Sequence, residues 1–131
     1  MSIALGNKFK HSFNINQSIY SGFISLFKDN NLLHTNIEYA KLKGFKGVVM
    51  HGNILNGFLS YFIGECLPTK DVIILSQQIN YNKPVYLNDN LEFEAEVAEV
   101  YESVNVIKFK FLFKNSIGTI VAKGNFQIGL T

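Results

Sequence analysis

The 131-residue sequence lacks arginine and tryptophan, and it contains a single cysteine, Cys66. One cysteine cannot form an intramolecular disulfide, so the chain is compatible with a reducing compartment. All 12 basic residues are lysines, and the formal net charge is only +2. The lysines are scattered, with Lys41, Lys43 and Lys46 as the one local cluster. Because no basic stripe is present, we expect no nucleic-acid partner.

Long hydrophobic runs are also absent. The most apolar stretch, residues 52–67, is interrupted by Asn53, Asn56 and Glu65 and is too short to span a bilayer. The first ten residues do not show the basic and then apolar pattern of a secretory signal. We therefore expect a soluble cytoplasmic protein without a membrane partner.

Charged residues are few, at 17% of the chain, whereas hydrophobic residues make up 47%. A chain of this size with so few charges is expected to bury much of its surface, part of it in an oligomer interface. The length favours one compact domain over residues 1–131. An edge strand left open by a sheet would be a template for pairing, which favours a homodimer or a multiple of one.

Alternating patterns dominate the second half of the chain. Residues 91–97, 107–114 and 122–128 alternate between apolar and polar, the period of a strand with one wet face. An Asn-Ser-Ile-Gly turn separates the last two segments. The polar positions of residues 91–97 are glutamates, and those of residues 107–114 are mainly lysines. Because opposite charges attract across neighbouring strands, this favours antiparallel pairing of the two segments. A further strand is predicted over residues 72–81.

The first half of the chain is mainly helical. After a short strand at residues 8–13, apolar spacing predicts a helix over residues 17–28, and a second helix, capped by Asn36, over residues 37–43. Residues 52–66 are apolar almost all round, which predicts a fully buried helix. One buried helix followed by long antiparallel strands indicates an α+β fold, in which an antiparallel sheet wraps around a long central helix.

Three motifs carry a resemblance to a known family. Asp29 and His34 form a D-x(4)-H motif, and His51 and Gly52 follow at the start of the apolar helix, His51 being 17 residues after His34. Residues 81–89 read Y-x-x-P-V-x-x-N-D, similar to the F-x-x-P-V-x-x-G-D stretch of the same family. Together these motifs resemble the MaoC-like (R)-specific enoyl-CoA hydratases, whose domain has the hotdog fold. The first motif alone occurs by chance, and its distance from the His-Gly pair makes the combination more specific.

The resemblance implies a hydratase or dehydratase that interconverts 2-enoyl and 3-hydroxyacyl thioesters of CoA or of an acyl carrier protein. This reaction needs a base for the water that attacks C3, an acid for C2, and donors for the charge on the thioester oxygen. Asp29 and His34 would be the catalytic pair, and the Gly52 N–H at the helix start would form the oxyanion hole. Four further residues are expected to bind substrate: His51, Asn53, Asn56 and Ser60.

Each of these residues also has a plainer interpretation. Asp29 is suited to ending the preceding helix in an Asp-Asn-Asn turn, and His34 to being an ordinary loop histidine. His51 is suited to a structural role at the start of the helix, and Ser60 to bonding a backbone carbonyl. The lysines at residues 41–46 fit a solvated face, or a surface that attracts the phosphates of a CoA or carrier-protein arm. The joint spacing of the motifs favours the catalytic interpretation.

The sequence departs from the family pattern at four positions. Leu32 replaces the usual proline of the first motif, and Asn88 replaces a glycine, a mild change because asparagine tolerates left-handed conformations. Asn53 and Asn56 stand where the family commonly has methionine and a small residue. Buried amides need partners. These two asparagines therefore either satisfy each other, or face the pocket and favour an acyl group that bears a hydroxyl or amide.

Two other functions remain open for this fold. A hotdog thioesterase would use an acidic residue to activate water against the thioester carbonyl, and a non-catalytic module would only bind acyl thioesters or a partner. The sequence contains no cluster of metal ligands and no glycine-rich phosphate loop, so we expect no metal or redox cofactor.

Overall fold

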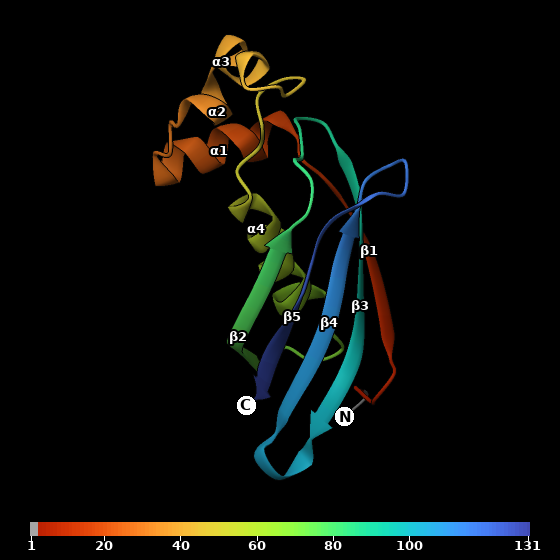
Figure 1. The fold of residues 1–131 in the computed structure, drawn as a ribbon. Coiled ribbons are helices and arrows are strands. Elements are labelled where there is room, and N and C mark those ends of the chain that lie inside the picture. Colours follow the sequence, from red (N-terminus) through yellow and green to blue (C-terminus); the bar gives the residue numbers. More distant parts are fainter. Residues whose placement is uncertain (1–2) are drawn as a thin grey trace.

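The computed structural model describes residues 3–131, and its strands form one five-stranded antiparallel sheet (Figure 1). The strands lie in the order β1-β3-β4-β5-β2, so β1 and β2 are the edge strands. All five predicted strands are confirmed, and two of them, β3 and β5, are longer by more than one residue than the sequence pattern indicated. Their bounds are β1 (Lys8–Asn14), β2 (Val72–Tyr81), β3 (Asn90–Tyr101), β4 (Val106–Lys114) and β5 (Ile120–Leu130).

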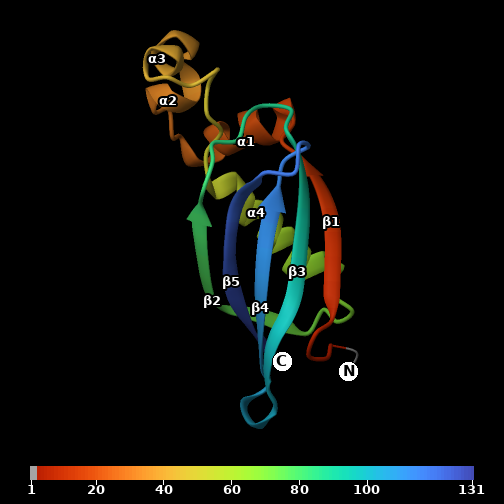
Figure 2. The ribbon, with the colours of Figure 1, turned by 45° about the vertical axis from the view of Figure 1, so that its right-hand side comes forward.

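One apolar helix crosses a face of this sheet (Figure 2). This helix is α4 (Asn53–Tyr61), and it continues into a π-helical turn (Phe62–Cys66). Three other helices gather beyond the end of the sheet at which β1 and β2 finish (Figure 1). They are α1 (Gln17–Phe27), α2 (Leu32–Thr35) and α3 (Ile37–Leu42). A short 3-10 turn (Glu102–Val104) joins β3 to β4 at the opposite end. The predicted α+β fold, a sheet around a central helix, is confirmed.

Asparagine side chains set the starts of the peripheral helices. Asn16 Oδ1 accepts a hydrogen bond from the Ile19 N–H at 2.9 Å and caps α1. Asn36 Oδ1 accepts from the Tyr39 N–H at 2.8 Å and caps α3, as the sequence predicted. Each cap satisfies one of the backbone donors that a helix start leaves unpaired. The chain reverses after α3 at Gly44, whose φ of +93° lies in the region that favours glycine.

The core is rich in phenylalanine and lies between the sheet and α4. Phe109 and Phe126 stack with their ring centroids 4.7 Å apart, and neither side chain is exposed. The opposite, wet face of the sheet pairs the glutamates of β3 with the lysines of β4, as predicted. Glu94 lies 2.9 Å from Lys114 Nζ. Donation from Lys114, its largest influence, holds the pKa of Glu94 below its ordinary value.

Helix α4 corrects one prediction from the sequence. It was expected to be buried all round, and it is buried on one side only, through Ile54, Leu55, Phe58 and Leu59. The other side is an exposed stripe that includes Asn53, Gly57, Ser60 and Tyr61. These residues recur three or four positions apart, so they share one helix face that the sheet does not cover. Among residues 3–131, no helix has the length and apolar character needed to cross a membrane.

Candidate active site

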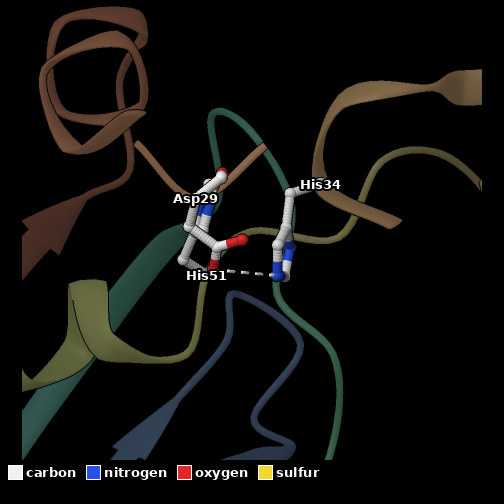
Figure 3. Close-up of side chains that lie close together, drawn as sticks. All are labelled: Asp29, His34 and His51. Carbon is white, nitrogen blue, oxygen red and sulfur yellow. Dashed lines mark hydrogen bonds and ion pairs between the residues drawn. The ribbon is translucent and has the colours of Figure 1, made fainter. Parts of the chain in front are cut away.

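Asp29 is placed by the end of α1. Lys28 takes a left-handed conformation, with φ of 59°, and its N–H still bonds to Ile24 O at 2.8 Å. Asp29 Oδ1 then accepts a hydrogen bond from the Asn31 N–H at 3.2 Å, the turn that the plainer interpretation anticipated. Its other oxygen, Oδ2, faces His34 Nε2 across 3.9 Å (Figure 3). One carboxylate oxygen therefore shapes the loop and the other remains available for chemistry.

His34 lies on α2 and is fixed at its other ring nitrogen. His34 Nδ1 lies 2.6 Å from Val49 O, and because a carbonyl only accepts hydrogen bonds, Nδ1 carries the proton in the neutral ring. Nε2 therefore presents its lone pair toward Asp29. The α2 start does not need the family proline, because Asn31 Oδ1 accepts from the Leu33 N–H at 2.9 Å. The Tyr20 hydroxyl donates to the main-chain carbonyl of His34 at 2.5 Å and ties α1 to α2.

His51 lies against both members of the pair. Its side chain is 2% exposed, and its ring stacks on that of His34 with centroids 4.0 Å apart. His51 Nε2 donates to Asp29 O at 2.9 Å, again toward a group that can only accept. The His51 ring also packs on the Phe23 ring, with centroids 4.6 Å apart. His51 thus holds the backbone of one catalytic candidate and the ring of the other, a link that local sequence did not reveal.

The three side chains are close enough to raise the question of a metal ion. One ligand atom from each of Asp29, His34 and His51 lies within 4.8 Å of the others. A shared ion needs the lone pairs of both imidazoles to meet at one point about 2.0–2.1 Å from each nitrogen. The two rings are instead stacked, with 29° between their planes, so lone pairs that lie in those planes do not converge. The arrangement suits acid–base chemistry better than metal coordination.

Gly52 begins α4 close to this pair. Within residues 3–131, neither the Gly52 N–H nor the Asn53 N–H has a hydrogen-bond acceptor, as is usual for the first turn of a helix. Both donors sit at the positive end of the helix dipole, which favours developing negative charge. A methyl group added at Gly52 would lie 2.9 Å from Tyr81 Cε1. A side chain at residue 52 would therefore displace the Tyr81 ring, a contact that the sequence analysis did not anticipate.

Two cavities meet at Asp29. The larger one, about 1120 Å³, lies between β1, α1 and α4, and its walls are mainly apolar. The smaller one, about 560 Å³, is lined by His34, His51 and Gly52. Asp29 and Asn53 line both cavities. An elongated molecule can therefore pass the catalytic candidates with one end at the α4 start and the other in the apolar cavity. The apolar wall of the larger cavity is formed chiefly by Phe13, Ile19, Phe23, Leu26, Ile54 and Phe58.

The remaining residues expected to bind substrate divide into two groups. Asn53 and Asn56 line the larger cavity and are hydrogen bonded to each other at 2.8 Å. Ser60 is exposed on α4 and lines neither cavity, so nothing in this arrangement brings it toward the pair. Tyr81 lines the smaller cavity and was not singled out from the sequence, although it opens the motif at residues 81–89. The catalytic roles of Asp29, His34 and Gly52 stay predictions that this geometry favours.

Comparison with known proteins finds relatives that share about 30% of their residues with this chain. It is 30% identical over 101 residues to an (R)-specific enoyl-CoA hydratase of Aeromonas caviae, covering 77% of this chain and 75% of that protein. It is 31% identical over 86 residues to a 3-hydroxybutyryl-CoA dehydratase of Methylorubrum extorquens, covering 66% of this chain and 55% of that protein.

Solved structures and a family model agree with these relatives. The structure of an (R)-hydratase from A. caviae superposes with a TM-score of 0.91 at 25% identity, covering 99% of this chain and 98% of that one. The unliganded R-hydratase PhaJ1 of Pseudomonas aeruginosa superposes with a TM-score of 0.88 at 27% identity, over 98% of this chain and 82% of that one. The model of the MaoC like domain matches residues 4–113. The chain therefore belongs to the MaoC-like domain family and has its hotdog fold.

Proposed function

We propose that this protein is an (R)-specific hydro-lyase that interconverts 2-enoyl and 3-hydroxyacyl thioesters of CoA or an acyl carrier protein. The observation that carries the proposal is the pair of acceptors, Asp29 Oδ2 and His34 Nε2, facing each other across 3.9 Å where the two cavities meet. The relatives named as an enoyl-CoA hydratase and a hydroxybutyryl-CoA dehydratase support it.

The two cavities suggest how the substrate lies. The thioester oxygen belongs at the start of α4, where the N–H groups of Gly52 and Asn53 have no protein acceptor. C3 then lies beside Asp29, which lines both cavities, and the acyl chain continues into the larger, apolar one. The polar end of the molecule meets backbone donors, and the apolar end loses contact with water.

The substrate water fits between the two acceptors. A water that donates one hydrogen to Asp29 Oδ2 and the other to His34 Nε2 presents its lone pair outward, toward C3. As its oxygen bonds to C3, one proton passes to the pair, and the π electrons of the C2–C3 bond move toward the thioester carbonyl. A proton from the pair then forms the C2–H bond, and the carbonyl is restored. Dehydration is the same sequence reversed.

The start of α4 stabilises the charge that forms between these steps. The enolate oxygen carries more negative charge than the ground-state carbonyl, so preorganised N–H donors and the helix dipole lower the barrier more than they strengthen substrate binding. Removal of one such donor in other enzymes costs roughly 10²- to 10³-fold in turnover. The Gly52 N–H would supply this donor here.

We also propose that residues 1–131 act as one domain within a cytoplasmic homodimer or a multiple of one. The edge strand β2 leaves Ile73, Ile74 and Leu75 exposed by 55%, 41% and 53%. An unpaired apolar edge is an aggregation hazard unless another chain covers it. A second copy that pairs along β2 would cover the edge by a closed two-fold contact.

The test uses one substrate with two readouts. Purified protein is mixed with crotonyl-CoA, while loss of the enoyl-thioester absorbance and release of free thiol are followed in parallel. We expect absorbance loss without thiol release, and the (R)-3-hydroxy product by chiral analysis. Thiol release without hydration would instead identify a thioesterase, and neither signal, over several enoyl chain lengths, would identify a binding module.

A further inference from the structure

Four side chains, those of Asn53, Asn56, Gln77 and Tyr81, form a hydrogen-bonded network beside the two cavities. Asn56 Nδ2 donates to Asn53 Oδ1 at 2.8 Å and to the Tyr81 hydroxyl at 2.9 Å. Asn56 Oδ1 accepts from Gln77 Nε2 at 2.5 Å. An amide nitrogen has two hydrogens, so both donors of Asn56 are used within the protein. Asn56 is therefore a support and has no donor left for a substrate.

Asn53 is the member of this network whose amide nitrogen is wholly unused, whereas the Tyr81 hydroxyl and Gln77 Nε2 each keep one hydrogen without an acceptor among residues 3–131. Asn53 Oδ1 receives the bond from Asn56, and its Nδ2 donates to no atom of residues 3–131. The side chain lines both cavities, as Asp29 does, and it follows directly on Gly52. Its two N–H groups are therefore placed where an acyl chain leaves the reacting carbons and enters the larger cavity.

The network is anchored on the sheet, which fixes the orientation of the Asn53 amide. Gln77 and Tyr81 both lie on β2. The Tyr81 ring packs against Gly52, and its hydroxyl reaches Asn56 four residues further on, so the ring spans the first turn of α4. Two of the four side chains, Asn53 and Asn56, are also among the departures from the family pattern that the sequence resembles. These two departures are bonded to each other and, through Asn56, to Tyr81.

Several other polar residues on the larger cavity are hydrogen bonded within the protein. Ser12 Oγ donates to Glu92 at 2.6 Å, and Asn14 Nδ2 donates to Asn90 Oδ1 at 2.9 Å. Asn16 Oδ1 caps α1. Asn16 Nδ2 and the hydroxyls of Ser18 and Tyr61 have no partner among residues 3–131 either, but these side chains line the larger cavity alone. Asn53 also lines the smaller cavity, so its unused donors mark a polar point at the catalytic end of a mainly apolar wall.

Resting on the proposed function, we propose that the acyl chain of the substrate carries one hydrogen-bond acceptor oxygen, one or two atoms beyond C3, and that Asn53 Nδ2 selects it. An ether, hydroxyl or carbonyl oxygen would accept from Asn53, and the apolar remainder would fill the larger cavity. A plain alkyl chain would cover both N–H groups without offering an acceptor. Unpaired donors of this kind make a site discriminate against the apolar analogue.

The experiment compares two chains of equal length. Hex-2-enoyl-CoA and 4-methoxybut-2-enoyl-CoA differ by one oxygen in place of the C5 methylene, and kcat/KM is measured for both in wild type and in Asn53→Leu. The difference in their intrinsic reactivity is the same for both proteins, so it cancels when the two preference ratios are compared. We expect the preference for the methoxy chain to fall about tenfold in Asn53→Leu, the effect of losing one hydrogen bond.

Two further variants sharpen the result. Asn53→Asp keeps an oxygen that accepts from Asn56 and lacks the Nδ2 donors, so it should lose the same preference with little change in shape. Asn125→Leu makes the matched substitution on β5, outside both site cavities, and should leave the ratio as in wild type. Circular dichroism confirms that each variant is folded.

The outcomes separate this inference from the proposed function. Hydration of both chains with the same preference ratio in wild type, Asn53→Leu and Asn53→Asp would overturn the selectivity of Asn53 and leave the hydratase in place. If the wild type hydrates neither of the two chains nor crotonyl-CoA, the proposed function itself is contradicted. The proposed acceptor oxygen in the acyl chain is then contradicted as well.

Discussion

Two regions of the molecule are held together in different ways. The first is the core between the sheet and α4, called the interior, and the second is the group formed by Asp29, His34 and His51, called the rim. The interior is built from side chains packed on side chains, such as Phe109 on Phe126. At the rim, the rings of His34 and His51 are held mainly by main-chain carbonyls, those of Val49 and Asp29. Packing provides stability in proportion to buried area, whereas directed hydrogen bonds provide orientation. Substitutions in the two regions should therefore affect different measurements.

The largest effect on stability is expected in the interior. Phe109→Ala removes a fully buried ring and should lower the free energy of unfolding by about 3–5 kcal/mol. The protein that remains folded should keep its turnover number, because Phe109 lines neither site cavity. Urea unfolding and active-site-normalised kinetics measure the two quantities. A fall in turnover as large as that of a rim variant would mean that the regions are not separable.

The catalytic pair should show the opposite behaviour. Asp29→Asn and His34→Gln should each lower turnover of an enoyl thioester by roughly a hundredfold or more, the usual scale for a positioned acid or base. The free energy of unfolding of Asp29→Asn should stay within about 0.5 kcal/mol of wild type, because its side chain is 49% exposed. His34→Gln should cost about 1 kcal/mol, because it loses the hydrogen bond from Nδ1 to Val49 O. Since the pair acts as a unit, the double variant should be little worse than either single variant. Near-normal turnover in folded Asp29→Asn would contradict the mechanism.

His51 lies at the boundary between the two regions, and two substitutions separate its contacts. His51→Phe keeps a ring to stack on His34 and loses the donor to Asp29 O, whereas His51→Gln keeps an amide donor and loses the stacking. We expect each to lower kcat by about tenfold with a smaller change in KM, because each displaces one member of the pair. Unchanged kcat in both variants, with altered stability, would make His51 a packing residue only.

The smallest effect is expected on the wet face of the sheet. Glu94→Gln removes the ion pair with Lys114 and should cost about 0.5 kcal/mol at pH 7. Because folding lowers the Glu94 pKa, this contribution is fully present above the ordinary glutamate pKa and disappears as the pH falls through the lowered value. Urea unfolding of both proteins at pH 7 and at pH 3 measures it. A difference that persists or grows at pH 3 would contradict the assignment.

These two regions also differ in how far the sequence predicted them. The strands and the core were predictable because alternation in β3 and β4 has only one arrangement that buries the phenylalanines. The helix caps were predictable at Asn36, where the capping residue and its partner are close in sequence. Alternation and capping depend on neighbouring residues in the sequence, so they indicate the secondary structure of a segment without knowledge of its tertiary contacts.

The rim was predictable in its residues and less so in its contacts. The pairing of Asp29 with His34 was implied by the resemblance to the family, and the two side chains lie 3.9 Å apart. The contacts of His51 with Asp29 O and of Tyr81 with Asn56 join residues 22 and 25 positions apart, and no local pattern encodes them. The half-exposed α4 was missed because composition alone cannot show which side of an apolar helix the sheet covers.

The carbonyl acceptors have an evolutionary consequence. Val49 O and Asp29 O belong to the main chain, so the bonds from His34 and His51 depend on the path of the backbone and not on the acceptor's side chain. Residue 49 is therefore free to drift among other aliphatic side chains while His34 stays aligned. A one-residue insertion or deletion between residues 45 and 51 would move the carbonyl away and cannot be rescued by any choice of side chain. We therefore expect a change of side chain at residue 49 to be tolerated better than a change in the length of this loop.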